Sequence, residues 1–167
     1  MLVYICRHGE AQPNALSGRD LDRTLTKKGR LQARYLASIL GALDATERPR
    51  RLLASPAIRT MQTAQSIADE LGLGIMSVDD LLPACHASTA LGVIERFSNG
   101  EQMAIVGHNP TMTAVLSVLS HGPSASCCMP GPALQTGHMA VVDVPWPCTA
   151  GTGNTLELHR YEPEPVA

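Results

Sequence analysis

Aromatic side chains are scarce in this chain of 167 residues, which has one Trp, one Phe and three Tyr. Because single-stranded nucleic acids bind by stacking their bases on aromatic side chains, the sequence predicts no such partner. The formal net charge of −2 also gives no electrostatic reason to expect a nucleic acid or a membrane surface. No hydrophobic run reaches the length of a bilayer span, and the N-terminus does not resemble a secretion signal. We therefore expect a cytoplasmic protein.

Cysteine occurs five times, but in no pattern that indicates a metal site or a disulfide framework. The number is odd and there is no C-x-x-C pair, so the spacing typical of zinc ligands is absent. Cys127 and Cys128 are adjacent, which leaves a redox pair open, although spare thiols in a reducing cytosol are the simpler interpretation. We predict neither a metal nor any other cofactor.

The length and a hydrophobic fraction of 44% predict one domain, over residues 1–161, that is large enough to bury a core. Residues 162–167, which begin with Glu162-Pro163-Glu164-Pro165, are predicted to form a mobile C-terminal tail. Short apolar runs alternate with helical patterns along the chain. This order predicts a three-layer α/β fold: a mostly parallel central sheet, helices on both faces and an antiparallel edge hairpin.

The apolar runs predict six strands, at residues 2–6, 51–54, 75–78, 103–106, 138–144 and 155–161. Thr26 is expected to cap the first long helix. Ser55-Pro56 and Asn109-Pro110 are each expected to start another helix, with a capping side chain and a proline in the first turn. A further helix is predicted over 87–97, and Gly72 is expected to end the helix that follows Ser55-Pro56.

Polar side chains follow three of the predicted buried strands. Arg7-His8-Gly9 follows the first strand, and Gly107-His108-Asn109-Pro110 follows the fourth. Ser55-Pro56 follows the second strand, and Arg59 lies in the helix that comes after it. Because the carboxyl ends of parallel strands meet at one edge of a sheet, where ligands bind, these residues are expected to converge. Two helix N-termini at the same edge favour an anion. Two arginines, two histidines and two helix starts predict a site for a dianionic phosphoryl group.

Each of these residues also has an ordinary interpretation. Arg59 alone would be a solvated surface charge, and His108 alone a hydrogen-bonded structural histidine. Their joint placement at one sheet edge favours a shared role. A metal site built from His8, His108 and Glu10 is disfavoured, because the two arginines beside it would repel a cation.

These residues resemble the motifs of the histidine phosphatase superfamily, which has the phosphoglycerate mutase-like fold. The matching residues, in order, are Arg7-His8-Gly9-Glu10-Ala11, Leu25-Thr26 with Gly29, Ser55-Pro56 with Arg59 and Thr63-Ala64, and Gly107-His108-Asn109-Pro110. The short chain and the His-Asn-Pro form of the last motif are similar to the SixA-type phosphohistidine phosphatase branch. The ordered match covers residues 1–120.

The resemblance implies a role for each matching residue. It implies that His8 is the nucleophile and forms a phosphohistidine intermediate, that Arg7 and Arg59 bind phosphate, and that His108 is a second histidine in contact with the phosphate. The chemistry agrees, since a neutral imidazole can attack phosphorus while cations stabilise the equatorial oxygens. Asn14, seven residues after Arg7, has the spacing of a further phosphate ligand in some members, although a loop asparagine also suits a turn.

Many family members carry an acidic proton donor after the third strand, but residues 81–88 contain no carboxylate. Glu10 and Asp80 are the candidate donors, although adjacent Asp79 and Asp80 also suit a solvated strand end, and His86 is a less usual donor. An alkoxide leaving group needs a donor, because the parent alcohol is a very weak acid. A phosphohistidine needs one less, because its imidazole, with a pKa near about 6.5, can leave already protonated on the other nitrogen.

The sequence therefore predicts a phosphohistidine phosphatase that works through a covalent phospho-His8 intermediate and without a metal. The resemblance implies a partner protein that bears phosphohistidine, such as a phosphotransfer domain or a phosphocarrier. A small-molecule phosphomonoesterase is the alternative in the same class, and a phosphoprotein-binding module without turnover is the alternative in another. A mutase is disfavoured, because the irregular segments 10–25 and 121–137 are short for lids that exclude water.

Overall fold

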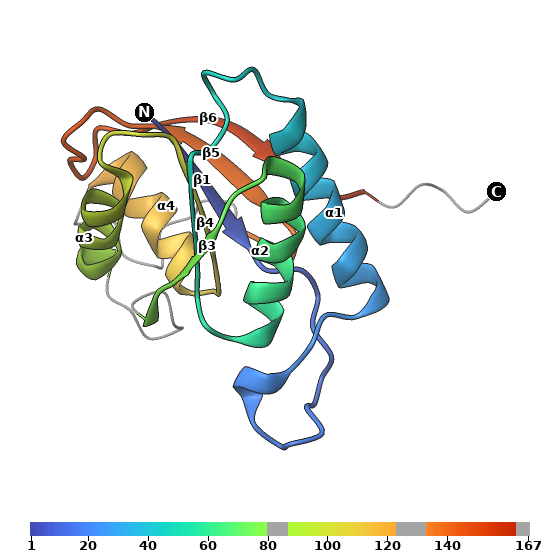
Figure 1. Cartoon of the computed structure of the whole chain (residues 1–167). Coiled ribbons are helices and arrows are strands. Elements are labelled where there is room, and N and C mark those ends of the chain that lie inside the picture. The colour runs from blue at the N-terminus through green and yellow to red at the C-terminus, as the bar shows by residue number, and fades with distance from the viewer. Residues whose placement is uncertain (80–86, 123–132, 163–167) are drawn as a thin grey trace.

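Six strands form one sheet in the computed structural model, which describes residues 1–79, 87–122 and 133–162 (Figure 1). The strands run in the spatial order β3-β2-β4-β1-β5-β6. Their bounds are β1 Leu2–Arg7, β2 Arg51–Ala54, β3 Ile75–Ser77, β4 Met103–Gly107, β5 Met139–Asp143 and β6 Asn154–His159. β1 to β4 are parallel, whereas β5 is antiparallel to β1 and β6 is antiparallel to β5. The predicted parallel sheet with an antiparallel edge hairpin is confirmed.

Helices cover both faces of the sheet, so the molecule has the three predicted layers. The helices of the described residues are α1 Lys27–Ala42, α2 Ile58–Leu71, α3 Ala87–Ser98 and α4 Thr111–His121. Figure 1 shows α1 and α2 on one face and α3 and α4 on the other. Side chains of β1 alternate between the two hydrophobic cores: Tyr4 packs with Leu36 and Ile67 on one face, and Ile5 packs with Val115 on the other.

The central strands are apolar throughout because both of their faces are covered. Every residue of β4 is buried, and the four inner residues of β1 are buried too. This is the pattern of a parallel sheet between two helix layers, and it explains why these strands are continuous apolar runs in the sequence. The edge strand β6 has four exposed residues at its start.

Two predicted helix boundaries are confirmed. The Thr26 hydroxyl accepts a hydrogen bond of 3.0 Å from the N–H of Gly29 and caps α1. Gly72 ends α2 in the left-handed conformation, with φ 67°, which a residue without a Cβ adopts at little cost. Both boundaries depend on residues within one helical turn, so the local sequence is sufficient to specify them.

The prediction that Ser55 and Asn109 cap the next two helices is wrong. Ala57 and Pro110 occupy the N-cap positions of α2 and α4, and neither helix has a side-chain cap. Ser55 Oγ instead lies 2.9 Å from Nε2 of His108, and both residues are buried. Ser55 therefore bonds to a residue that is distant in the sequence, although its local pattern is that of a helix cap.

The predicted loop 10–25 contains a short 3₁₀ helix, η1 Asp20–Asp22, and an isolated bridge between Ala11 and Leu25. Several residues discussed above lie outside the described part of the chain, namely Asp80, His86, Cys127, Cys128 and residues 163–167 of the predicted tail. Among the helices that are described, none is long and apolar enough to cross a membrane.

Candidate active site

The carboxyl ends of β1, β2 and β4 lie next to one another, because β4 pairs with β1 on one side and with β2 on the other. Arg7 ends β1 and His8 follows it, His108 follows β4, and Arg59 lies in the first turn of α2. The structure brings these four side chains to one cavity of about 290 Å³. The cavity is also lined by Glu10, Ala11, Arg23, Asn109 and Thr136.

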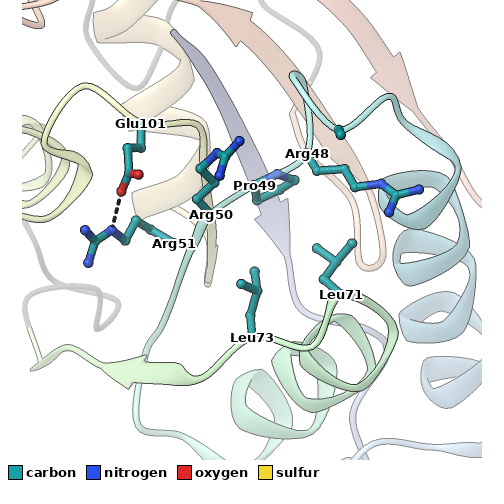
Figure 2. Close-up of a pocket in the computed structure, with 8 residues that line it drawn as sticks. Arg48, Pro49, Arg50, Arg51, Leu71, Leu73 and Glu101 are labelled. Atoms are coloured by element: carbon teal, nitrogen blue, oxygen red, sulfur yellow. Dashed lines mark hydrogen bonds and ion pairs between the residues drawn. The ribbon is translucent and has the colours of Figure 1, made fainter.

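A larger cavity, of about 520 Å³, lies at the start of β2, at the opposite edge of the sheet (Figure 2). It is lined by Ala45, Arg48, Pro49, Arg50, Arg51, Leu71, Leu73 and Glu101. Arg51 pairs with Glu101 at 2.8 Å, and Arg48 donates hydrogen bonds to main-chain carbonyls at the end of α1. The described lining includes no histidine or cysteine, so the nucleophilic side chains belong to the smaller cavity.

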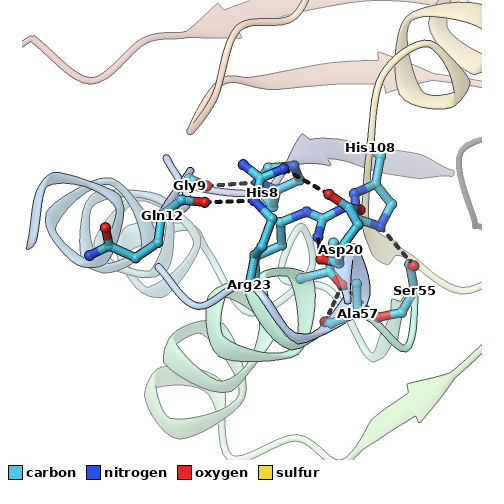
Figure 3. A network of polar contacts seen from close by, with 10 residues as sticks. His8, Gly9, Gln12, Asp20, Arg23, Ser55, Ala57 and His108 are labelled. Atoms are coloured by element: carbon cyan, nitrogen blue, oxygen red, sulfur yellow. Dashed lines mark hydrogen bonds and ion pairs between the residues drawn. The ribbon is translucent and has the colours of Figure 1, made fainter. Parts of the chain in front are cut away.

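His8 is buried, and its ring is oriented by its own loop (Figure 3). Its Nδ1 lies 2.7 Å from the carbonyl oxygen of Gly9. Because a carbonyl can only accept a hydrogen bond, Nδ1 carries the proton and Nε2 keeps its lone pair. Burial, opposed by the Gly9 hydrogen bond and reinforced by the charges of Arg59 and Arg7, lowers the pKa of His8 to about 4. The ring is therefore neutral near pH 7 and has a nucleophilic nitrogen.

We expect the His8 imidazole to titrate near pH 4 rather than near the ordinary value of about 6.5. Because the folded state disfavours the imidazolium, the stability linked to neutral His8 is fully present above about pH 6.5 and declines as the pH falls towards 4. The Cε1 proton of His8, assigned by comparison with His8→Gln, can be followed by NMR from pH 8 to pH 4. A midpoint above pH 6 would contradict the expectation.

His108 faces His8 edge to face, with the ring centroids 5.0 Å apart. Burial, followed by the charges of His8 and Arg59, lowers the pKa of His108 to about 3. The Ser55 hydroxyl, 2.9 Å from Nε2, can donate to that nitrogen and so place the proton of the neutral ring on Nδ1. Nδ1 is buried and has no hydrogen-bond partner among the described residues. His108 can therefore donate a hydrogen bond to a ligand in the cavity.

Arg7 has a second buried nitrogen without a partner. Its Nη1 donates to the carbonyl of Leu134 at 2.9 Å, which anchors the guanidinium. Its Nε is buried and, within the described part of the structure, no group accepts its proton. Buried polar atoms are almost always hydrogen-bonded in folded proteins. Arg7 Nε and His108 Nδ1 are therefore suited to the oxygens of an anionic ligand.

Sequence reasoning missed two charged residues of the segment 10–25. Arg23 lines the cavity, and Asp20 connects it to Arg59 (Figure 3). Asp20 Oδ1 accepts from Arg23 Nη1 at 2.8 Å, and Oδ2 accepts from Arg59 Nη2 at 2.9 Å. In the sequence this segment is a charged loop with no periodicity, so nothing in it distinguishes these charges from solvated ones. The position of Arg23, two residues before the motif Leu25-Thr26, is the one available signal.

Of two other predicted site residues, Glu10 lies at the His8 cavity and Asn14 does not. Asn14 is exposed and lines a separate cavity of about 640 Å³, next to Leu16 and Ile58, so the structure does not bring it to His8. Glu10 lines the His8 cavity, but its Oε1 accepts from the Thr26 hydroxyl at 2.8 Å. In the described ranges, no group of three or more His, Cys, Asp or Glu side chains is arranged to hold a metal ion.

Two glycines of the motifs allow α1 to pack against the loop that carries His8. A Cβ on Gly9 would overlap the carbonyl oxygen of Gly29, and a Cβ on Gly29 would overlap the carbonyl oxygen of Glu10. Glycine is required where two backbones approach this closely. The contact helps to fix the Gly9 carbonyl, which orients the His8 ring.

In its fold and in the motifs at its sheet edge, the chain is similar to members of the histidine phosphatase superfamily. The model of branch 1 of this superfamily matches residues 3–82. Among curated proteins, the chain is similar to the probable phosphoglycerate mutase GpmB of Enterobacter sp. (strain 638), with 43% identity over 77 residues, which is 44% of this chain. The matches cover only 26% to 58% of the lengths of the curated relatives.

Two solved structures are similar to this chain over nearly its whole length. One is the protein histidine phosphatase SixA complexed with tungstate, with a TM-score of 0.78 and 24% identity over 95% of this chain and 96% of that chain. The other is the putative phosphohistidine phosphatase SixA from Agrobacterium tumefaciens, with a TM-score of 0.77 and 28% identity over 96% of this chain and 98% of that chain. Both have the phosphoglycerate mutase-like α/β fold that the sequence predicts.

Proposed function

We propose that this chain is a phosphohistidine phosphatase with His8 as its nucleophile. The observation that carries the proposal is a neutral imidazole beside two buried nitrogens that lack partners among the described residues, Arg7 Nε and His108 Nδ1. A phosphoryl group supplies the acceptor oxygens that these donors need, and its charge suits the neighbouring Arg59 guanidinium.

The reaction needs two displacements at phosphorus. In the first, the Nε2 lone pair of His8 forms a bond to phosphorus, and the bond between phosphorus and the substrate nitrogen breaks with its electrons going to that nitrogen. The substrate imidazole leaves neutral when its other nitrogen already carries a proton. In the second, water attacks phosphorus and the His8 nitrogen recovers its lone pair, while both protons of the water leave with the phosphate as H₂PO₄⁻. The Gly9 carbonyl, 2.7 Å from Nδ1, stabilises the positive charge of the phosphorylated ring.

The carboxylates near the cavity support a phosphoramidate substrate over an alkyl ester. Hydrogen bonds from Arg23 and Arg59 hold the pKa of Asp20 below its usual value, so this carboxylate stays ionised at neutral pH. Glu10 accepts a hydrogen bond from Thr26 and lies 3.4 Å from Lys28 Nζ. Both carboxylates are therefore already engaged by neighbouring side chains among the described residues, which weakens the case for either as a proton donor. A leaving imidazole that is already protonated does not require one.

The degree of structural similarity also supports the proposal. The two SixA structures have TM-scores of 0.78 and 0.77, whereas a mycobacterial glucosyl-3-phosphoglycerate phosphatase that covers 96% of this chain has a TM-score of 0.71. We propose a phosphohistidine-bearing protein, such as a phosphotransfer domain or a phosphocarrier, as the partner. Hydrolysis of small phosphate monoesters is the alternative activity for the same site.

We expect the enzyme to hydrolyse a phosphoramidate with a kcat/KM about 10²-fold or more above that for an alkyl phosphate, because an alkoxide leaving group needs a proton donor and the two carboxylates described near the cavity are already engaged. An aryl phosphate should lie between them, since a phenol is a stronger acid than an alcohol. Phosphate release from a phosphorylated histidine protein, free phosphoramidate, aryl phosphate and alkyl phosphate measures this order. A preference for the alkyl ester would overturn the proposal and indicate a proton donor.

A further inference from the structure

Asp20 is bonded to both arginines that flank the mouth of the cavity. Besides its two carboxylate bonds, its main-chain carbonyl accepts a third hydrogen bond, of 2.6 Å, from Arg59 Nη1. The side chain of Arg59 is 5% exposed and that of Arg23 is 28% exposed, whereas that of Asp20 is 60% exposed. Asp20 therefore contacts the two guanidiniums from the solvent side, and it is not among the residues that line the cavity.

The bonds to Asp20 leave part of each guanidinium available. Arg59 uses Nη1 and Nη2 for Asp20, so its Nε and one hydrogen on each terminal nitrogen remain for another acceptor. Arg23 uses Nη1 for Asp20 and Nε for the main-chain carbonyl of Gln12. The carboxylate also lies between two positive charges that would otherwise repel each other. Asp20 can thus hold both arginines without consuming all of their donors.

We propose that Asp20 is a positioning residue, whose carboxylate holds the guanidiniums of Arg59 and Arg23 at the phosphoryl cavity. The inference rests on the proposed function in one respect, that a phosphoryl group binds beside Arg59. Long arginine side chains lose rotamer freedom when they bind a ligand, and a tether that fixes them in advance reduces this loss. Asp20 thereby connects η1 to oxyanion binding, although it does not contact the substrate.

The test compares Asp20→Asn with Asp22→Asn. Asp22 lies on the same 3₁₀ helix, but its carboxylate accepts from Ser17 and lies 3.8 Å from Arg19. Both substitutions remove one negative charge from η1, so any difference between them reports the tether rather than the net charge. We expect the dissociation constant for orthophosphate and for tungstate to rise about two- to fivefold in Asp20→Asn, the range for loss of partly exposed ion pairs, and to stay near wild type in Asp22→Asn.

Four further readouts separate positioning from a general loss of structure. KM for a phosphoramidate should rise with the oxyanion dissociation constant while kcat changes less, and Asp20→Glu should recover part of the affinity. In an Arg59→Ala background, Asp20→Asn should have a smaller effect, because one of the two guanidiniums that the carboxylate holds is gone. The midpoint of thermal unfolding should be similar in Asp20→Asn and Asp22→Asn.

Each outcome has a distinct meaning. Unchanged oxyanion affinity in Asp20→Asn would overturn the inference, and tighter binding would show that the carboxylate competes with the phosphoryl group instead of positioning its ligands. Oxyanion affinity is measured without turnover, so the inference survives if the enzyme prefers esters to phosphohistidine. Conversely, wild-type turnover of phosphohistidine with an unaffected Asp20→Asn variant would refute the tether alone.

Discussion

His8→Ala is expected to lower phosphate release by roughly 10⁴-fold or more, as removal of a covalent nucleophile does in other enzymes. The His8 imidazole is neutral, and its Nε2 keeps the lone pair that attacks phosphorus. Alanine provides no nitrogen for this attack. Phosphate binding should persist, because Arg7, Arg59 and His108 still line the cavity. Steady-state phosphate release and the dissociation constant for orthophosphate would measure the two effects separately.

The intermediate provides a second measurement for this variant. A labelled substrate, quenched in alkali during turnover, should leave an acid-labile phosphoryl group on the wild-type chain and none on His8→Ala. His121→Ala is the matched control, since His121 is an exposed residue in the last turn of α4, on another part of the molecule. It should retain both turnover and labelling. Turnover of His8→Ala at the wild-type rate would mean that His8 is not the nucleophile.

Arg7→Lys is expected to lower kcat/KM about 10²-fold, although the substitution conserves the charge. The guanidinium of Arg7 spans two acceptors: Nη1 donates to the Leu134 carbonyl, and Nε is left for a ligand oxygen. The three donors of a lysine ammonium share one nitrogen, which cannot occupy the positions of both Nη1 and Nε. Either the anchor to Leu134 or the contact with the phosphoryl group is therefore lost. Kinetics with a phosphoramidate and equilibrium binding of orthophosphate would measure the change.

The control for Arg7→Lys is Arg50→Lys. Arg50 is exposed and lines the cavity at the opposite edge of the sheet, so this substitution should leave kcat/KM at the wild-type value (Figure 2). If Arg7→Lys also retained full activity, a positive charge alone would be enough at this position. The role proposed for Arg7 Nε would then be wrong.

Features that depend on neighbouring residues could be predicted from the sequence. The buried strands β1 and β4 are continuous apolar runs, and the Thr26 cap and the Gly72 terminus involve residues of one helical turn. The parallel topology then follows from the alternation of strands and helices, and it brings the residues after β1, β2 and β4 to one edge. The convergence of His8 and His108 could therefore be predicted without knowing individual side-chain contacts.

Features that depend on distant partners could not be predicted in this way. Ser55 has the local pattern of a helix cap, yet it bonds to His108, which is 53 positions away in the sequence. Asp20 and Arg59 are 39 positions apart, and a polar segment without periodicity does not show which of its charges face the protein. Asn14 has the spacing of a phosphate ligand, but the path of the loop leaves it exposed beside another cavity.

The sequence alone thus determined the α/β fold, the sheet edge at which the candidate site lies, and the presence of Arg7, His8, Arg59 and His108 there. It could do so because apolar periodicity and strand order are local properties that constrain the topology strongly. Only the tertiary structure decided which nitrogen of His8 carries the proton, which buried nitrogens of Arg7 and His108 lack described partners, and that Asp20 contacts Arg59. These features arise from hydrogen-bond geometry and burial, which exist only after distant segments have packed together.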